Sequence, residues 1–138
     1  MAAEPLRSLL RLRRFAMDEA RRQLAMRLRS EGEATDHLAA VEAAVRRETV
    51  LAEELAGTDM AGWAYPVWLR RIQQTRRDAE ATVQAAAEHT SAAQADLADA
   101  RAAARGLEAA LDRQEVAHQA SLARQEQALL DEAGLRRR

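Results

Sequence analysis

Residues 69–111 read LRRIQQTRRDAEATVQAAAEHTSAAQADLADARAAARGLEAAL, and this stretch specifies the fold. Its apolar side chains return every seven positions, and a second apolar series lies three or four residues from the first. The members are Leu69, Ile72, Ala79, Val83, Ala86, Ala93, Leu97, Ala100, Leu107 and Leu111. A sustained three-four spacing predicts a helix with one dry face along its whole length.

The first part of the chain carries the same repeat. Its members are Leu10, Met17, Ala20, Leu24, Ala34, Leu38, Val41, Val45 and Leu55. A single break, GTDMAGWAYP at residues 57–66, separates the two stretches. Two such helices joined by one break predict an all-α fold, a long antiparallel two-helix coiled-coil hairpin.

The breakers set the predicted boundaries of this single domain, residues 1–138. Pro5 suits the first turn of a helix over about residues 6–56, and Gly57 suits a left-handed stop. Thr58 or Asp59 is a candidate cap for a short turn inside the break, residues 57–66. Pro66 then begins a second helix over about residues 67–133, which has no breaker before Gly134 except the single Gly106.

The second helix is predicted to outrun the first. Folding at the break pairs positions whose numbers add to about 123. The start of the first helix, at residue 6, therefore lies opposite about residue 117. The heptad phase also slips after Leu111. A C-terminal helical overhang follows, and it still carries Leu122, Leu129, Leu130 and Leu135. Such an end either frays in water or is covered by another protein.

The middle of the hairpin is predicted to be its weakest part. Glu31 takes a seam position, Gly32 follows it, and both face Thr90. A polar pair costs packing, and a helical glycine costs about 1 kcal/mol against alanine. This feature is either a tolerated defect or a point of bending.

Composition limits the chemistry. The chain of 138 residues has a net charge of −1, no cysteine, and 21 basic residues that are all arginine. No apolar run reaches the ~20 residues of a membrane span, and no apolar core follows the N-terminal arginines as in a signal peptide. We therefore expect a cytoplasmic protein.

No motif for catalysis or metal binding is present. The glycines are scattered, so there is no phosphate loop. Glu115–His118 and Glu33–His37 have helical spacing, but a di-iron bundle needs two such units and further glutamates on four helices. We expect no catalytic residue, no cofactor, no metal and no small-molecule substrate.

Arginine is concentrated at one end of the predicted hairpin. Residues 7–29 hold eight arginines against two acids, and residues 136–138 are arginines at the same end. The other arginine doublets alternate with acids and suit a solvated face. The near-neutral net charge argues against nucleic acid and favours an acidic protein surface as the partner.

Aromatic residues are concentrated at the other end. Trp63, Tyr65 and Trp68 lie within six residues of one another. They either close the turn and cover the helix ends, or they anchor a partner at an exposed tip. Beyond them, Ile72, Arg76, Ala79 and Val83 share one helix face.

Several stretches resemble the flagellar export protein FliJ family. The opening PLRSLLRLRR of residues 5–14, with DEAR at 18–21, looks like that family's N-terminal helix. The closing LARQEQALLDE of residues 122–132 looks like its C-terminal pattern. Thr58-Asp-Met60, Trp68 and the IQQT of residues 72–75 also resemble family members.

The resemblance implies a non-catalytic central stalk in the hexameric ring of the flagellar export ATPase. Such proteins also contact the export gate protein FlhA and escort substrate chaperones, peripherally at the export apparatus of the inner membrane. The implied ATPase contacts are Arg7, Arg11, Arg13, Arg14, Arg124, Gln125, Asp131 and Glu132. The implied gate contacts are Trp68, Ile72, Arg76, Ala79 and Val83, with the tip aromatics Trp63 and Tyr65 nearby.

Three alternatives stay open on the sequence. One is a homodimeric coiled-coil scaffold or adaptor without an ATPase partner. Another is a binder of nucleic acid or of a membrane surface that uses the arginine-rich start. The third is the equivalent stalk of an injectisome, which the same residues fit equally well.

Overall fold

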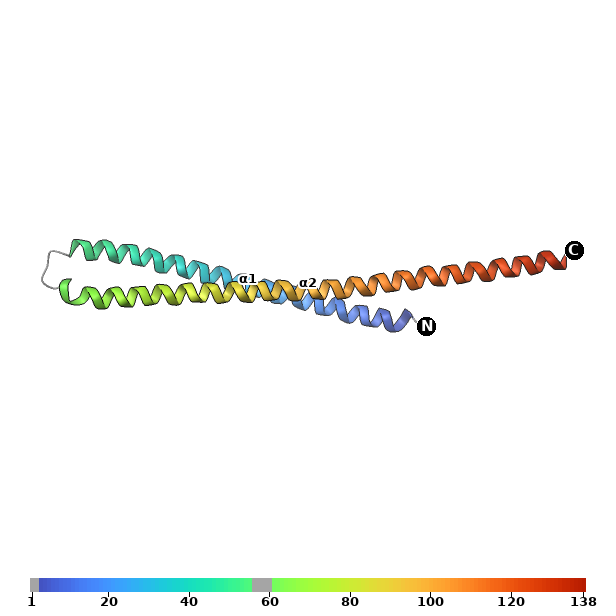
Figure 1. Ribbon diagram of the computed structural model, residues 1–138, viewed down its shortest axis with the longest axis horizontal. Coiled ribbons are helices and arrows are strands. Elements are labelled where there is room, and N and C mark those ends of the chain that lie inside the picture. Colours follow the sequence, from blue (N-terminus) through green and yellow to red (C-terminus); the bar gives the residue numbers. More distant parts are fainter. Residues whose placement is uncertain (1–2, 56–60) are drawn as a thin grey trace. The chain divides into compact units, whose positions relative to one another are not determined.

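The chain consists of two long helices. The computed structural model describes residues 3–55 and 61–138, with the backbone alone for residues 61–64. Helix α1 spans Ala3–Glu54 and helix α2 spans Ala61–Arg136 (Figure 1). These described residues contain no strand. The predicted all-α fold, with two long helices packed against each other, is confirmed.

Helix α2 begins earlier than predicted. It starts at Ala61, so the prediction that Pro66 begins this helix is wrong. The proline lies in the second turn, where its missing N–H removes one helical hydrogen bond close to the helix start. The helix also continues through Gly134 to Arg136. The predicted stop at Gly57 and the cap at Thr58 or Asp59 lie outside the described residues.

The chain divides into two compact units. One unit comprises residues 21–96, and the other comprises residues 1–20 with residues 97–138. Both helices contribute to each unit, because α1 and α2 each run on from one unit into the other.

In the unit of residues 21–96 the helices run antiparallel. Contacts at Arg27, Glu42 and Glu48 along α1 are made with Thr90, Arg76 and Trp68 of α2, in reverse order. The buried apolar residues of this unit are Ala34, Ala79 and Ala93. Because these side chains are small, the larger seam residues, such as Leu38, Val41, Val45 and Val83, are half-buried around them.

The weak middle lies in this unit and is accommodated within the helices. Thr90 is buried, and its hydroxyl donates a hydrogen bond of 3.3 Å to the backbone carbonyl of Arg27. Glu31 is half-buried, and α1 continues as one α-helix through Gly32. The hydroxyl of Thr90 therefore finds a backbone acceptor inside the seam.

One predicted seam residue lies outside the seam. Leu55 belongs to the predicted seam series, but α1 ends at Glu54 and Leu55 is exposed. Trp68 donates its indole N–H to Oε2 of Glu48 at 2.7 Å. The cross-helix contacts of this unit, Arg27–Thr90, Glu42–Arg76 and Glu48–Trp68, join positions whose numbers add to 116–118. The register of the unit therefore differs by about six residues from the predicted pairing, in which the numbers add to about 123.

In the unit of residues 1–20 and 97–138, α1 packs against α2 around two leucines. Leu10, Leu97 and Ala104 are buried, and Met17, Leu107 and Leu111 are half-buried beside them. Nη2 of Arg14 lies 3.3 Å from Oε1 of Glu108 across the two helices. Beyond the start of α1, α2 continues alone to the C-terminus (Figure 1).

Candidate functional site

The C-terminal part of α2, residues 119–136, has no α1 beside it, and we call it the overhang. It is about 18 residues long, or roughly 27 Å at ~1.5 Å per residue. Every residue from 119 to 136 except Ser121 is exposed. The exposed apolar side chains are Leu122, Leu129, Leu130 and Leu135. The predicted overhang is therefore helical, and its leucines face solvent.

Three polar side chains of the overhang interact within their own helix. Nε of Arg124 donates to the carbonyl oxygen of Ala120 at 3.3 Å, and Nε2 of Gln127 donates to Oδ1 of Asp131 at 2.9 Å. Gln125 and Glu132 are exposed. The four overhang residues proposed for ATPase contact are thus displayed on the surface, and no described residue of α1 pairs with them.

The N-terminal arginines differ in how far they are neutralised. Glu4 lies 4.0 Å from Arg7 and 3.8 Å from Arg11, and Arg14 pairs with Glu108. Arg13 is exposed and has no ion-pair or hydrogen-bond partner among the described residues. Arg13 is therefore the cation of this group that is most available to an external acid.

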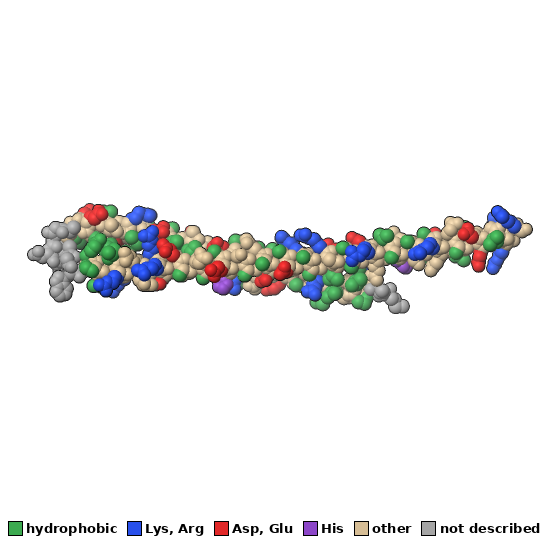
Figure 2. All heavy atoms as spheres, viewed as in Figure 1, with side chains coloured by type: hydrophobic (Ala, Val, Ile, Leu, Met, Phe, Trp, Pro, Cys, Tyr) green, Lys and Arg blue, Asp and Glu red, His purple; other side chains and the backbone are tan. Residues whose placement is uncertain are grey.

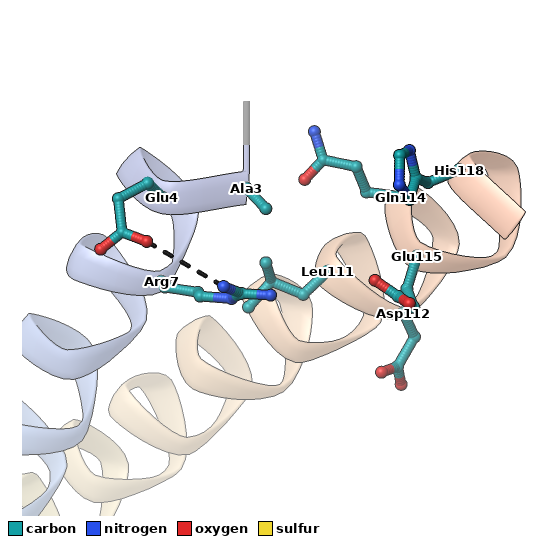
Figure 3. Close-up of a pocket in the computed structure, with 8 residues that line it drawn as sticks. All are labelled: Ala3, Glu4, Arg7, Leu111, Asp112, Gln114, Glu115 and His118. Atoms are coloured by element: carbon teal, nitrogen blue, oxygen red, sulfur yellow. Dashed lines mark ion pairs between the residues drawn. The ribbon is translucent and has the colours of Figure 1, made fainter. Parts of the chain in front are cut away.

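An open hollow of about 880 Å³ lies where α1 begins beside α2. It is lined by Ala3, Glu4, Arg7, Leu111, Asp112, Gln114, Glu115 and His118 (Figure 3). The only ion pair drawn among them joins Glu4 and Arg7, and Oε1 of Gln114 is buried without a hydrogen-bond partner in the described chain. The hollow marks the point at which α2 loses its neighbour.

The described residues hold no group of three or more His, Cys, Asp or Glu side chains arranged to bind a metal ion. Within the same residues, neither helix has a stretch long and apolar enough to cross a membrane.

The sequence reasoning missed an apolar strip on the outer face of α1. Leu9, Leu12 and Phe15 follow one another at three-residue spacing and are 38%, 64% and 69% exposed. Hydrophobic side chains are gathered at the N-terminal end of α1 in the space-filling view (Figure 2). The three-residue spacing of these side chains is visible in the sequence. They were missed because the heptad series includes only the apolar residues that face α2, and these three lie outside it. We call these three residues the outer strip.

Most of the residues implied to contact the export gate lie between the two helices. Ala79 is 3% exposed, and Ile72 and Val83 are half-buried against α1. Arg76 is exposed and lies 4.0 Å from Glu42 and 3.4 Å from Glu80. Ala79 therefore offers no contact surface while the helices are packed, which corrects its place in the predicted set.

Trp68 holds the two helices together near the break. Its indole N–H bonds to Glu48 of α1, and its ring centroid lies 5.6 Å from that of Tyr65. Tyr65 itself is exposed, and the side chain of Trp63 lies outside the described residues. Trp68 thus links α2 to α1 near the break, and Tyr65 is the exposed aromatic side chain of this pair.

Comparison with protein-family models, with curated proteins and with solved structures finds no match to this chain.

Proposed function

We propose that this chain is a non-catalytic central-stalk component of the flagellar type III export apparatus. It inserts its basic helix ends into the ring of the export ATPase and acts in the cytoplasm, peripherally at the inner-membrane export machinery. The observation that carries the proposal is the overhang, a helix with exposed leucines and no neighbouring helix. The resemblance of residues 5–14 and 122–132 to the FliJ family supplies the identity of the ring.

The energetics of the overhang support a partner. Most helix stability in proteins comes from the packing of an apolar face. The overhang continues α2 but packs against no other helix among the described residues, so it lacks that contribution. Leu122, Leu129 and Leu130 lie seven and eight positions apart and therefore share one face. A ring that encloses the helix would cover this face.

The charges of the same unit support an acidic lining for that ring. Four arginines and no acid occur in residues 7–16, and Arg13 has no partner in the described chain. Arg7, Arg11 and Arg14 each pair with an exposed carboxylate, and Arg11 also donates to Oγ of Ser8 at 3.2 Å; exposed ion pairs of this kind contribute little to stability. These arginines can therefore exchange their partners for ring carboxylates at small cost.

The residues that follow the break are proposed to meet the export gate protein FlhA and substrate chaperones. The side chains accessible for that contact are Tyr65, Arg76 and the exposed edges of Ile72 and Val83. Arg76→Glu is expected to weaken binding to the cytoplasmic domain of FlhA, whereas Arg124→Glu on the overhang is not. Equal effects of the two variants would exclude a gate contact at these residues.

The stalk function is tested by ATP hydrolysis with the purified export ATPase of the same genome. The full chain is expected to raise the rate, and both deletion of residues 119–138 and Leu129→Asp/Leu130→Asp are expected to abolish the increase. Val50→Asp, an exposed apolar position in the other unit, is the matched control and should retain it. A truncated chain that stimulates as well as the full chain would refute the proposal. Parallel assays with an injectisome ATPase distinguish the two export systems.

A further inference from the structure

We propose that the ATPase ring encloses the start of α1 as well as the overhang, that it contacts the outer strip with apolar side chains, and that its contact with α1 ends before residues 18–19. This enclosure rests on the proposed stalk function. It adds the chemistry of the ring lining and the depth to which the chain enters the ring. The side chains that require it are Leu9, Leu12 and Phe15, all of them exposed.

The outer strip belongs to a longer apolar face of α1. Pro5, Leu9, Leu12 and Ala16 are spaced by four, three and four residues, so they share one face of the helix, and Phe15 lies beside it. All five residues are exposed. The contact with α2 is made by a different face, on which Leu10 is buried.

The arginines of this segment lie on the opposite side of α1. Arg7 and Arg11 are each two residues from Leu9, and Arg14 is two residues from Leu12. Residues two apart in a helix of 3.6 residues per turn point in roughly opposite directions. The side chains of Arg7, Arg11 and Arg14 are more than half exposed, so the start of α1 has an exposed apolar face and an exposed cationic face back to back.

A partner that surrounds α1 is needed to cover both faces. A membrane surface, or a single helix of a second copy, lies along one side of α1 and leaves the opposite side in water. The pore of a ring contacts the helix from several sides at once. A ring whose subunits each present carboxylates and apolar side chains can therefore pair with the arginines from one subunit and cover the outer strip from another.

Both exposed faces end at the same level of α1. Asp18 follows Arg11 by seven residues and Arg14 by four, and Glu19 follows Leu12 and Phe15 by the same two intervals. Each acid therefore lies on the continuation of one face. A carboxylate lining would repel Asp18, and an apolar lining would take Glu19 out of water, which is costly for a charge. The contact of the ring with α1 therefore ends at about Ala16.

This limit sets how much of α2 the ring encloses. Arg14 is level with Glu108, and the order of contacts is reversed between the helices, so Ala16 is level with about residue 106. From there to Arg136, α2 has about 30 residues, or roughly 45 Å at ~1.5 Å per residue. The overhang is the outer part of this enclosed length.

The test uses single-cysteine variants, because the chain contains no cysteine of its own. Each full-length variant is labelled with a maleimide, with and without the export ATPase hexamer, and the mass of this chain is followed over time. With the ring at about ten times its Kd, Leu12→Cys, Phe15→Cys and Leu129→Cys are expected to react about tenfold more slowly, because only free chain is labelled. Met26→Cys is the matched control, since Met26 is 60% exposed and lies beyond the proposed limit, and its rate should not change.

Each other outcome has a separate meaning. Protection of Leu129→Cys without protection of Leu12→Cys and Phe15→Cys would overturn the enclosure of α1 and leave the stalk function standing. Protection of none of the three would overturn both. Protection of Met26→Cys as well would refute the proposed depth. Protection of Leu12→Cys in the absence of the ATPase, on concentrating the chain or on adding phosphatidylglycerol vesicles, would assign the outer strip to a second copy or to a lipid surface instead.

Discussion

Replacing Leu97 by alanine tests whether the seam of the hairpin stabilises the fold as its burial indicates. Leu97 is 6% exposed and Leu51 is 55% exposed, so the same substitution can be compared at two depths of burial. Fully burying a leucine side chain contributes about 1.5–3 kcal/mol, and truncation adds a cavity term. Because a two-helix seam can partly close over the gap, we expect Leu97→Ala to cost about 2–4 kcal/mol.

Leu51→Ala is the matched control for this prediction. Less than half of its side chain is covered, so the transfer term is about 1 kcal/mol, and alanine regains a few tenths through its higher helix propensity. The free energies of unfolding come from urea titrations followed by far-UV circular dichroism. Hydrogen exchange of peptides from residues 97–118 shows whether the loss is local to that seam. Equal costs at Leu97 and Leu51 would refute the assignment of Leu97 to the core.

Three further sets of substitutions test other contacts. Gly32→Ala and Gly106→Ala should each stabilise the chain by about 0.5–1 kcal/mol, because a Cβ at either position meets nothing within 4 Å and alanine is the better helix former. Each variant should therefore have a higher midpoint of thermal unfolding, and a lower midpoint would contradict this prediction. Trp68→Phe should lower the free energy of unfolding by about 0.5–1.5 kcal/mol in urea titrations, because it removes the hydrogen bond to Glu48. If Glu48→Ala lowers the free energy of unfolding equally in the wild type and in the Trp68→Phe variant, this hydrogen bond contributes nothing. Arg14→Ala should change stability by less than about 1 kcal/mol, because the pair with Glu108 is exposed, and a loss several times larger would show that this pair is shielded from water.

The two helices, their antiparallel pairing and the overhang could be predicted from the amino-acid sequence. These features follow from local rules, because the heptad series fixes one dry face per helix and a helix advances by a constant rise per residue. The predicted seam positions from Leu10 to Val45 and from Leu69 to Leu111 are accordingly buried or half-buried. The arginine-rich start and the leucines after residue 118 were also evident in the sequence.

Which surfaces stay available to a partner depended instead on how the helices pack. Packing covered Ala79, exposed Leu55, gave Trp68 a partner on α1, and left Leu9, Leu12 and Phe15 uncovered. It also paired Arg14 with Glu108 and left Arg13 without a partner among the described residues. Periodicity marks an apolar face but not how much of that face one neighbouring helix can cover, since coverage depends on the register and width of the neighbour. The candidate binding surfaces therefore follow from tertiary contacts that no local pattern specifies.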